Sequence, residues 1–222
     1  MKIALMTILL LALGAGNAFA ANPRVEMQTN VGNIVVELFP DKAPKTVENF
    51  INYVKSGFYE GTIFHRVIDG FMVQGGAFSK TMEWRRPPSD PIFNEAKNGL
   101  TNEPGTIAMA HDRDPNSATT QFYFNLESNK HLNYYRDDPG YYGHCVFGKV
   151  IKGRDIIQLI AERPTGAAGP FIANVPLDPV VIEKVAILDE EIAPPPAKSK
   201  LKTKGKSHGK TKDESRRHLA GS

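Results

Sequence analysis

The sequence predicts a mainly β fold, in which a closed antiparallel sheet is covered by two α-helices. Three observations lead to this prediction. Short segments rich in β-branched and aromatic residues recur along the chain, joints rich in Gly and Pro separate them, and only two segments have the periodicity of a buried helix face. Together they indicate many short strands that are joined by turns.

The predicted strands follow one another along most of the chain. Asn30-Val31-Gly32 separates the first two, so an opening hairpin is expected. A second hairpin turns at Asp69-Gly70, a dipeptide that suits the positive φ of a tight turn. The expected strands cover residues 25–29, 33–38, 64–68, 71–76, 106–110, 121–125, 145–151 and 180–188.

Two segments have helical spacing. The first extends from Pro44, which suits a first helical turn, to a stop at Gly57. The second covers residues 154–161. In the first segment the apolar residues recur at i, i+3, i+4 and i+7, which is the spacing of one buried face. These residues are Val47, Phe50, Ile51 and Val54.

Two long loops complete the predicted domain. Residues 77–104 and 129–143 contain the Pro, Gly and Asn residues that interrupt regular structure. We expect Trp84 to pack within the first loop, and a partly exposed lid residue is the alternative interpretation.

Composition and charge divide the chain into parts. Its 222 residues are 41% hydrophobic and 23% charged, as in a soluble globular protein with one full core. The formal net charge of +3 is unevenly distributed, because residues 193–222 contain nine Lys and Arg against two acidic residues. That segment has no apolar face, so we predict a disordered basic tail after a single folded domain, residues 21–192.

Residues 1–20 have the pattern of a signal peptide. Lys2 gives a positive start, an apolar run covers residues 3–13, and Ala18-Phe19-Ala20 is a small-residue cleavage site. A membrane anchor is the weaker interpretation, because the apolar run is too short to span a bilayer. The mature protein is therefore expected to be exported, to a periplasm or, as the alternative, out of the cell.

Nucleophile and metal chemistry find little support in the sequence. Cys145 is the only cysteine, and its apolar neighbours favour a small buried side chain over a reactive thiol. The six histidines show no short ligand spacing, so we expect no metal site and no zinc hydrolase. His111, Asp112 and Ser117 lie in one loop without a nucleophile elbow, which disfavours a protease triad.

Residues 64–76 contain the main candidate functional side chains of the domain. Around the turn of this hairpin lie Arg66, Gln74 and the apolar pair Phe71-Met72. Arginine keeps its proton at working pH, so it donates hydrogen bonds and cannot act as a base. A fixed guanidinium beside an apolar wall suits a neutral amide that carries an apolar ring, and a prolyl peptide fits this description.

Three ordered blocks of residues strengthen this interpretation. The first is Phe64-His65-Arg66 with Gly70-Phe71-Met72 and Gln74-Gly75-Gly76, the second is 105–110 with 117–123, and the third is 146–150. The three blocks resemble the cyclophilins, the cyclosporin-type peptidyl-prolyl isomerases. The resemblance covers about residues 23–188.

The resemblance implies a fold, an activity and a set of site residues. The fold is an eight-stranded antiparallel β-barrel capped by two helices, and the activity is that of a monomeric, cofactor-free peptidyl-prolyl cis–trans isomerase of the bacterial exported type. Arg66 is implied to be the catalytic hydrogen-bond donor. The implied substrate-binding residues are Phe71, Met72, Gln74, Ala110, His111, Gln121, Tyr123, Leu132 and His144.

His144 matches the pocket histidine of the family, and the other substrate-binding residues each have an expected task. The proline ring is expected to bind against an apolar wall, Gln74 and Gln121 to orient the substrate backbone, and Ala110 and His111 to hold the residue before proline. Strand alternation directs Phe71 and Met72 to opposite faces, so at least one of them is expected in the core. The expected wall consists of Phe71, Met72, Tyr123 and Leu132, whereas Phe122 is expected in the core.

The expected reaction needs no nucleophile, metal or cofactor, because no bond is cleaved. Rotation about a peptide bond faces a barrier of about 18–20 kcal/mol, since the nitrogen shares its lone pair with the carbonyl. An enzyme lowers this barrier by binding the twisted amide better than either planar form. The alternative function is a chaperone module that binds prolyl peptides without turnover.

Two positions depart from the family pattern. Tyr123 stands where the family often has Phe, and its added hydroxyl requires a partner. His131 stands where the family has its drug-binding tryptophan, so we predict weak cyclosporin binding with catalysis retained.

The expected partners are unfolded or newly exported polypeptides that contain X-Pro bonds. The basic tail could contact polyanionic surfaces, although a solubilising extension is the simpler interpretation. Specific nucleic-acid binding is not expected of an exported protein.

Overall fold

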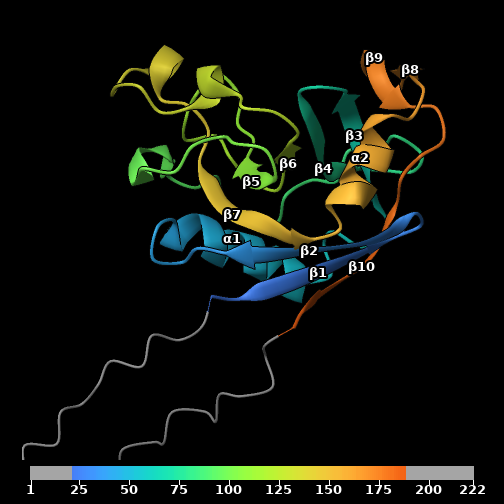
Figure 1. The fold of residues 1–222 in the computed structure, drawn as a ribbon, viewed down its shortest axis with the longest axis horizontal. Coiled ribbons are helices and arrows are strands. Elements are labelled where there is room, and N and C mark those ends of the chain that lie inside the picture. Colours follow the sequence, from blue (N-terminus) through green and yellow to red (C-terminus); the bar gives the residue numbers. More distant parts are fainter. Residues whose placement is uncertain (1–21, 189–222) are drawn as a thin grey trace, which may run out of the picture. The chain divides into compact units, whose positions relative to one another are not determined.

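The computed structural model describes residues 22–188, and Figure 1 shows the path of this part of the chain. The predicted signal peptide, residues 1–20, and the predicted basic tail, residues 193–222, lie outside the described residues. The end of the predicted domain 21–192, beyond Leu188, also lies outside them.

Apolar alternation builds the first hairpin, as predicted. Strand β1 (Arg24–Thr29) buries every second residue and pairs antiparallel with β2 (Gly32–Leu38). Thr29 closes the turn between them, because its hydroxyl donates to the Gly32 carbonyl over 2.6 Å and accepts from the Val31 N–H over 3.2 Å. A short polar turn thus fixes the register of two buried strands.

Eight strands form one antiparallel sheet in the order β10-β1-β2-β7-β5-β6-β4-β3. The two edge strands approach each other through a bridge between Ile63 and Val181, and the Phe64 N–H donates to the Val180 carbonyl over 3.1 Å. The sheet is therefore a nearly closed barrel, which confirms the predicted fold. The remaining strands are β3 (Thr62–Ile68), β4 (Met72–Ser79), β5 (Thr106–Met109), β6 (Phe122–Asn125), β7 (Val146–Lys152) and β10 (Ile182–Ile187).

The two predicted helices are α1 (Pro44–Lys55) and α2 (Arg154–Ala161), and their buried apolar residues belong to the barrel core. Helix α1 has no capping side chain of its own. The carboxylate of Glu95 takes this role, because it accepts from the N–H of Thr46 over 2.8 Å. Neither helix has the length and hydropathy that a membrane-crossing helix requires, as judged over the described residues.

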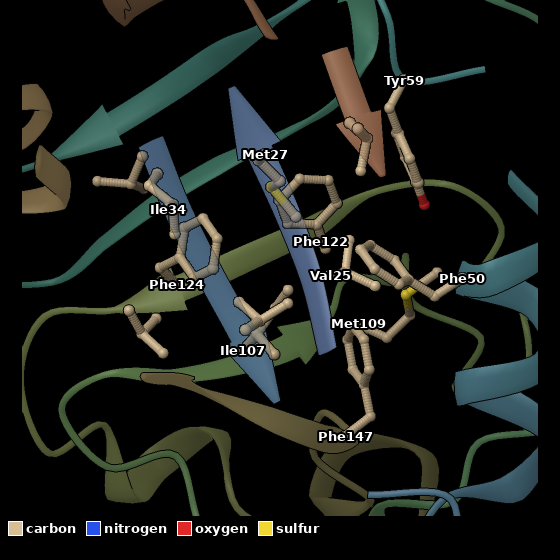
Figure 2. Close-up of a cluster of buried hydrophobic side chains, with 14 of the residues drawn as sticks. Val25, Met27, Ile34, Phe50, Tyr59, Ile107, Met109, Phe122, Phe124 and Phe147 are labelled. Atoms are coloured by element: carbon tan, nitrogen blue, oxygen red, sulfur yellow. The ribbon is translucent and has the colours of Figure 1, made fainter. Parts of the chain in front are cut away.

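Aromatic rings fill the interior of the barrel (Figure 2). Phe122 is fully buried, and its ring meets the rings of Phe50 and Tyr59 edge to face at centroid distances of 5.6 and 5.4 Å. The Tyr59 hydroxyl donates to the Thr120 carbonyl over 2.9 Å, so the polar atom of this buried ring is paired. The expectation that Phe122 belongs to the core is confirmed.

A second, two-stranded sheet was not predicted. It consists of β8 (Thr165–Ala168) and β9 (Phe171–Pro176), and Phe171 attaches it to the barrel by packing against Phe78 and His65 at 5.1 and 5.4 Å. Its strands lack a clear apolar alternation, so their pairing depends on this tertiary contact rather than on a local pattern.

Two single-residue expectations have different outcomes. Cys145 is buried, and burial raises the pKa of its thiol to about 12, so the interpretation as a small apolar side chain is confirmed. The expectation that Trp84 packs within its loop is wrong, because 56% of its surface is exposed. Short 3-10 turns occupy parts of the loops, at Ala96–Asn98, Lys130–Leu132 and Pro139–Tyr141.

Candidate active site

The candidate site lies on the outer face of the strands whose inner face forms the core. In β6, Phe122 and Phe124 belong to the core, and Tyr123 between them belongs to a second apolar cluster. Met72 of β4 belongs to this second cluster, and the next residue, Val73, belongs to the core. The period of two along a strand thus separates site from core within the same strands.

A cavity of about 230 Å³ opens beside this second cluster. Nine of the ten predicted site residues line it, and Gln121 is the exception. The structure therefore brings together residues from five places in the chain: the hairpin 66–74, the residues 110–111 after β5, strand β6, the turn at Leu132 and the residue His144 before β7. The lining residues are Arg66, Phe71, Met72, Gln74, Ala110, His111, Tyr123, Leu132 and His144.

Arg66 lies half-buried in the wall of this cavity. Strand register places it opposite Gln74, and its Nη1 donates to Gln74 Oε1 over 3.4 Å. Its guanidinium carbon lies 5.9 Å from the centroid of the Phe71 ring. Burial lowers the pKa of Arg66, but arginine still remains protonated at neutral pH. Arg66 makes no ion pair with a carboxylate of residues 22–188, so donors remain for a ligand.

The expectation that Phe71 and Met72 point to opposite faces is wrong. Phe71 lies in the turn before β4, where its N–H donates to the Ile68 carbonyl over 3.1 Å, so strand alternation does not apply to it. Its ring stacks on His131 at 5.5 Å, and both Phe71 and Met72 line the cavity. Met72 is 2% exposed, because it packs within the second apolar cluster as well as lining the cavity.

Gln121 lies next to the cavity rather than in it. Gln74 Nε2 donates to Gln121 Oε1 over 2.9 Å, and this bond joins the two residues that were expected to orient a substrate backbone. Gln121 lines a neighbouring cavity of about 430 Å³, which the exposed ring of Trp84 also lines. The two cavities share Gln74, Ala110 and His111, so they form adjoining parts of one surface.

Two stacked histidine rings form another side of the cavity. His111 and His144 lie 4.0 Å apart at their centroids, and the ring nitrogens of His111 lie 2.7 and 2.9 Å from the carbonyl oxygens of Asp112 and Gly143. Burial, and secondarily the neighbouring His111, lower the pKa of His144 to about 4. His144 is therefore a neutral ring at physiological pH, suited to form a wall rather than to carry charge.

Asn102 forms hydrogen bonds to two residues that line the cavity, and the sequence analysis did not identify it. It is fully buried, and its Oδ1 accepts from the Tyr123 hydroxyl over 2.8 Å, so the required partner of that hydroxyl exists. Its Nδ2 donates to the Leu132 carbonyl over 3.0 Å. The only sequence signal for this residue was the need of Tyr123 for a partner, and that need does not indicate which residue meets it.

The arrangement defines a class of site. A fixed cation faces an apolar cavity, two glutamine amides adjoin it, and the described residues contain no group of three or more His, Cys, Asp or Glu side chains that could ligate a metal. These groups suit binding of a neutral, partly apolar amide. The guanidinium can also donate a hydrogen bond to the amide when the amide is twisted out of its plane.

Comparison with known proteins agrees with this class. Residues 24–187 match the family model described as cyclophilin type peptidyl-prolyl cis-trans isomerase. The chain therefore belongs to the cyclophilin family, and it is a peptidyl-prolyl cis–trans isomerase. A peptidyl-prolyl cis-trans isomerase of Acinetobacter baylyi is 52% identical over 75% of this chain and 86% of that protein. Isomerase B of Escherichia coli is 46% identical over 73% of this chain and 98% of that protein.

Solved structures show the same fold. A crystal structure of a cyclophilin-type isomerase of Cryptosporidium parvum matches with a TM-score of 0.60 at 26% identity, and the match covers 75% of this chain and 97% of that one. A second structure of that protein, determined in the presence of the dipeptide Ala-Pro, matches with a TM-score of 0.60 at 27% identity, over 74% of this chain and 98% of that one.

Proposed function

We propose that Arg66 is the catalytic group of this isomerase and that it acts on the nitrogen of the prolyl bond. In the planar amide the nitrogen lone pair is delocalised, but in the twisted state the nitrogen becomes pyramidal and can accept a hydrogen bond. A donor aimed at this nitrogen stabilises only the twisted state, which is the condition for a faster rotation. The observation that carries the proposal is the Arg66 guanidinium in the wall of a partly apolar cavity, where it makes one long hydrogen bond to Gln74 and no ion pair with a carboxylate of residues 22–188.

The cavity is proposed to take the proline ring. Its apolar side consists of Phe71, Met72, Tyr123 and Leu132, and its volume of about 230 Å³ leaves room for a small ring. The C. parvum relative was crystallised in the presence of Ala-Pro, which supports a prolyl ligand for a site of this kind.

Polar groups around the cavity are proposed to fix the peptide on either side of the ring. The hydrogen-bonded pair Gln74 and Gln121 offers amide groups to the substrate backbone, and Ala110 and His111 lie where the two adjoining cavities meet. A chain that enters along Ala110 would thus place its next residue, the proline, beside Arg66.

The clients are proposed to be newly exported polypeptides whose folding waits for X-Pro isomerisation. The signal-peptide pattern of residues 1–20 supports an exported enzyme, with a periplasm as the first expectation. Sequencing the N-terminus of the protein purified from a cell-envelope fraction tests this. A start at Ala21 is expected, and an intact Met1 in a cytosolic fraction would contradict it.

Turnover, rather than holding of prolyl segments, is tested by refolding of a denatured protein whose slow phase is proline isomerisation. The isomerase is expected to speed that phase at concentrations far below those of the client. A chaperone module without turnover would instead slow refolding or act only in stoichiometric amounts.

Weak cyclosporin binding is also proposed. His131 stacks on Phe71, which lines the cavity of Arg66, and His131 itself lines an adjoining cavity. An imidazole offers less apolar surface than the indole that the family has at this position. The substitution His131→Trp is expected to tighten cyclosporin binding by an order of magnitude or more with little change in isomerase activity. A nanomolar dissociation constant for the natural protein would refute this proposal.

A further inference from the structure

We infer that the loop 130–144 forms a second substrate subsite, which binds an aromatic side chain located after the proline. This inference rests on the proposed function, because it extends the path of the prolyl peptide beyond the cavity of Arg66. It names a substrate class, namely X-Pro segments with an aromatic residue in the first positions after proline.

The subsite is a cavity of about 440 Å³ within this loop. It is continuous with the candidate active site, since both cavities are lined by His111, Leu132 and His144. A peptide with its proline beside Arg66 therefore has an adjoining surface for its next residues. Its further lining includes Tyr135, Pro139 and Tyr141.

The lining suits an aromatic ring. Tyr135 and Tyr141 are 75% and 50% exposed, and their ring centroids lie 6.3 Å apart. Adjoining exposed apolar side chains mark binding surfaces, and tyrosine is enriched among the residues that contribute most to binding. Stacking of a further ring on such side chains adds favourable energy beyond its buried area.

The charges of the loop are largely matched within the described residues. The Arg136 guanidinium lies 3.7 Å from the centroid of the Tyr141 ring and 3.8 Å from the Asp138 carboxylate. Asp137 pairs with Lys97 over 2.8 Å. Among the described residues, the remaining cation that lines the cavity is the exposed Lys130. Lys130 could favour an acidic residue over an aromatic one, so the test below compares the two.

The loop is pre-organised, which reduces the entropy lost on binding. The Tyr135 N–H donates to the Tyr141 carbonyl over 3.0 Å, and the His144 N–H donates to the Leu132 carbonyl over 2.8 Å. At the neck, Gly143 has a φ of 71°, and an added Cβ would lie 2.4 Å from the carbonyl carbon of Asn133. The two aromatic residues are therefore presented on a closed loop rather than on a loose one.

The positions of the three cavities indicate that the loop cavity binds residues after the proline rather than residues before it. Ala110 and His111 are proposed to hold the residue before proline. His111 lines all three cavities and gives no direction, whereas Ala110 lines the cavity of Arg66 and the cavity of Trp84 but not the loop cavity. Residues before the proline thus lead towards Trp84, and residues after it lead towards Tyr135.

The test uses peptides of one length with Phe, Ala or Glu at the first, second or third position after proline. Their catalysed cis–trans exchange is measured by NMR without a coupling protease. For at least one position we expect kcat/KM to be about two- to tenfold higher with Phe than with Ala, from the energy of one ring contact. Tyr135→Ala is expected to abolish this ratio, whereas Phe93→Ala, which removes an exposed ring outside the cavity, preserves it.

Each result has a defined meaning. A preference for Phe that Tyr135→Ala removes supports the subsite. Equal rates for Phe and Ala at all three positions, a higher rate with Glu, or a preference that Tyr135→Ala leaves intact overturns it. If the Ala peptides themselves are not accelerated, the proposed function fails instead, so the two failures are distinguishable. Thermal unfolding of each variant verifies that it is folded.

Discussion

The inner and outer faces of strands β4, β5, β6 and β7 are built from alternating residues of the same segments and have opposite properties. Inside, rings such as Phe122 and Phe147 are fully buried and fill the barrel (Figure 2). Outside, Ala108, Tyr123 and Val146 form a smaller cluster that leaves a cavity open beside Arg66. The packed inner face thus holds the strands rigidly, and the same strands position the site residues on the outer face.

The polar groups of the two faces differ as well. Within the described core, apolar contacts dominate, whereas behind the outer cluster Asn102 bonds to Tyr123 and to the backbone of Leu132. Hydrogen bonds fix direction, which a hydrophobic contact alone does not. A site that must aim a guanidinium at one atom benefits from such directional support.

The largest expected effect is a difference in the free energy of unfolding between a substitution on the inner face and one on the outer face. Phe122→Ala leaves a void among four rings and should lower the free energy of unfolding by about 3–5 kcal/mol. Phe71→Ala on the outer face should cost about 1 kcal/mol or less, because the residue is partly exposed, but it should raise KM for prolyl peptides. Urea unfolding and isomerase kinetics measure the two effects. Similar losses of stability in both variants would contradict the division.

A pH effect on stability is expected next. Burial, as the main cause, lowers the pKa of His65 to about 4, and His65 is 1% exposed with no partner for its Nδ1 among the described residues. The unfolded state therefore binds the proton at higher pH than the folded state. The stabilisation is complete above about pH 6.5 and is lost as the pH falls towards 4, by on the order of 3 kcal/mol. His144 has the same sign.

Unfolding by urea at pH 7 and pH 4.5 measures this dependence. His65→Phe, which keeps a ring between Phe78 and Phe171, is expected to flatten it markedly. An unchanged pH dependence in that variant would show that His65 is not its source.

A smaller effect tests the support behind the outer face. Asn102→Ala removes the acceptor of the Tyr123 hydroxyl and should cost about 2 kcal/mol of stability with a rise in KM. Tyr123→Phe removes only the hydroxyl and should cost about 1 kcal/mol. If Asn102→Ala changed neither quantity, the hydrogen bonds behind the cavity would have no part in shaping it.

The division of faces also explains what the sequence could predict. Apolar periodicity indicated the strands, both helices and Phe122, because burial in one core leaves a pattern of two or 3.6 residues. It wrongly assigned Phe71 and Met72 to opposite faces, because the turn removes Phe71 from the strand alternation. The hairpin β8–β9 and Asn102 depend on contacts between distant segments, and no local pattern records those contacts. The exposure of Trp84 is a property of the folded surface, which the local pattern also did not indicate.

The central claim is that Arg66 stabilises the twisted amide more than the bound planar one. NMR exchange measurements on one X-Pro peptide give both kcat and the dissociation constant for the natural protein and for Arg66→Ala. Arg113→Ala, which removes the same charge from an exposed position, is the matched control. We expect Arg66→Ala to lower kcat about 10- to 100-fold while the dissociation constant changes by less than about threefold, since a charge-assisted hydrogen bond contributes about 1.5–3 kcal/mol. Equal losses in kcat and in binding would contradict the claim.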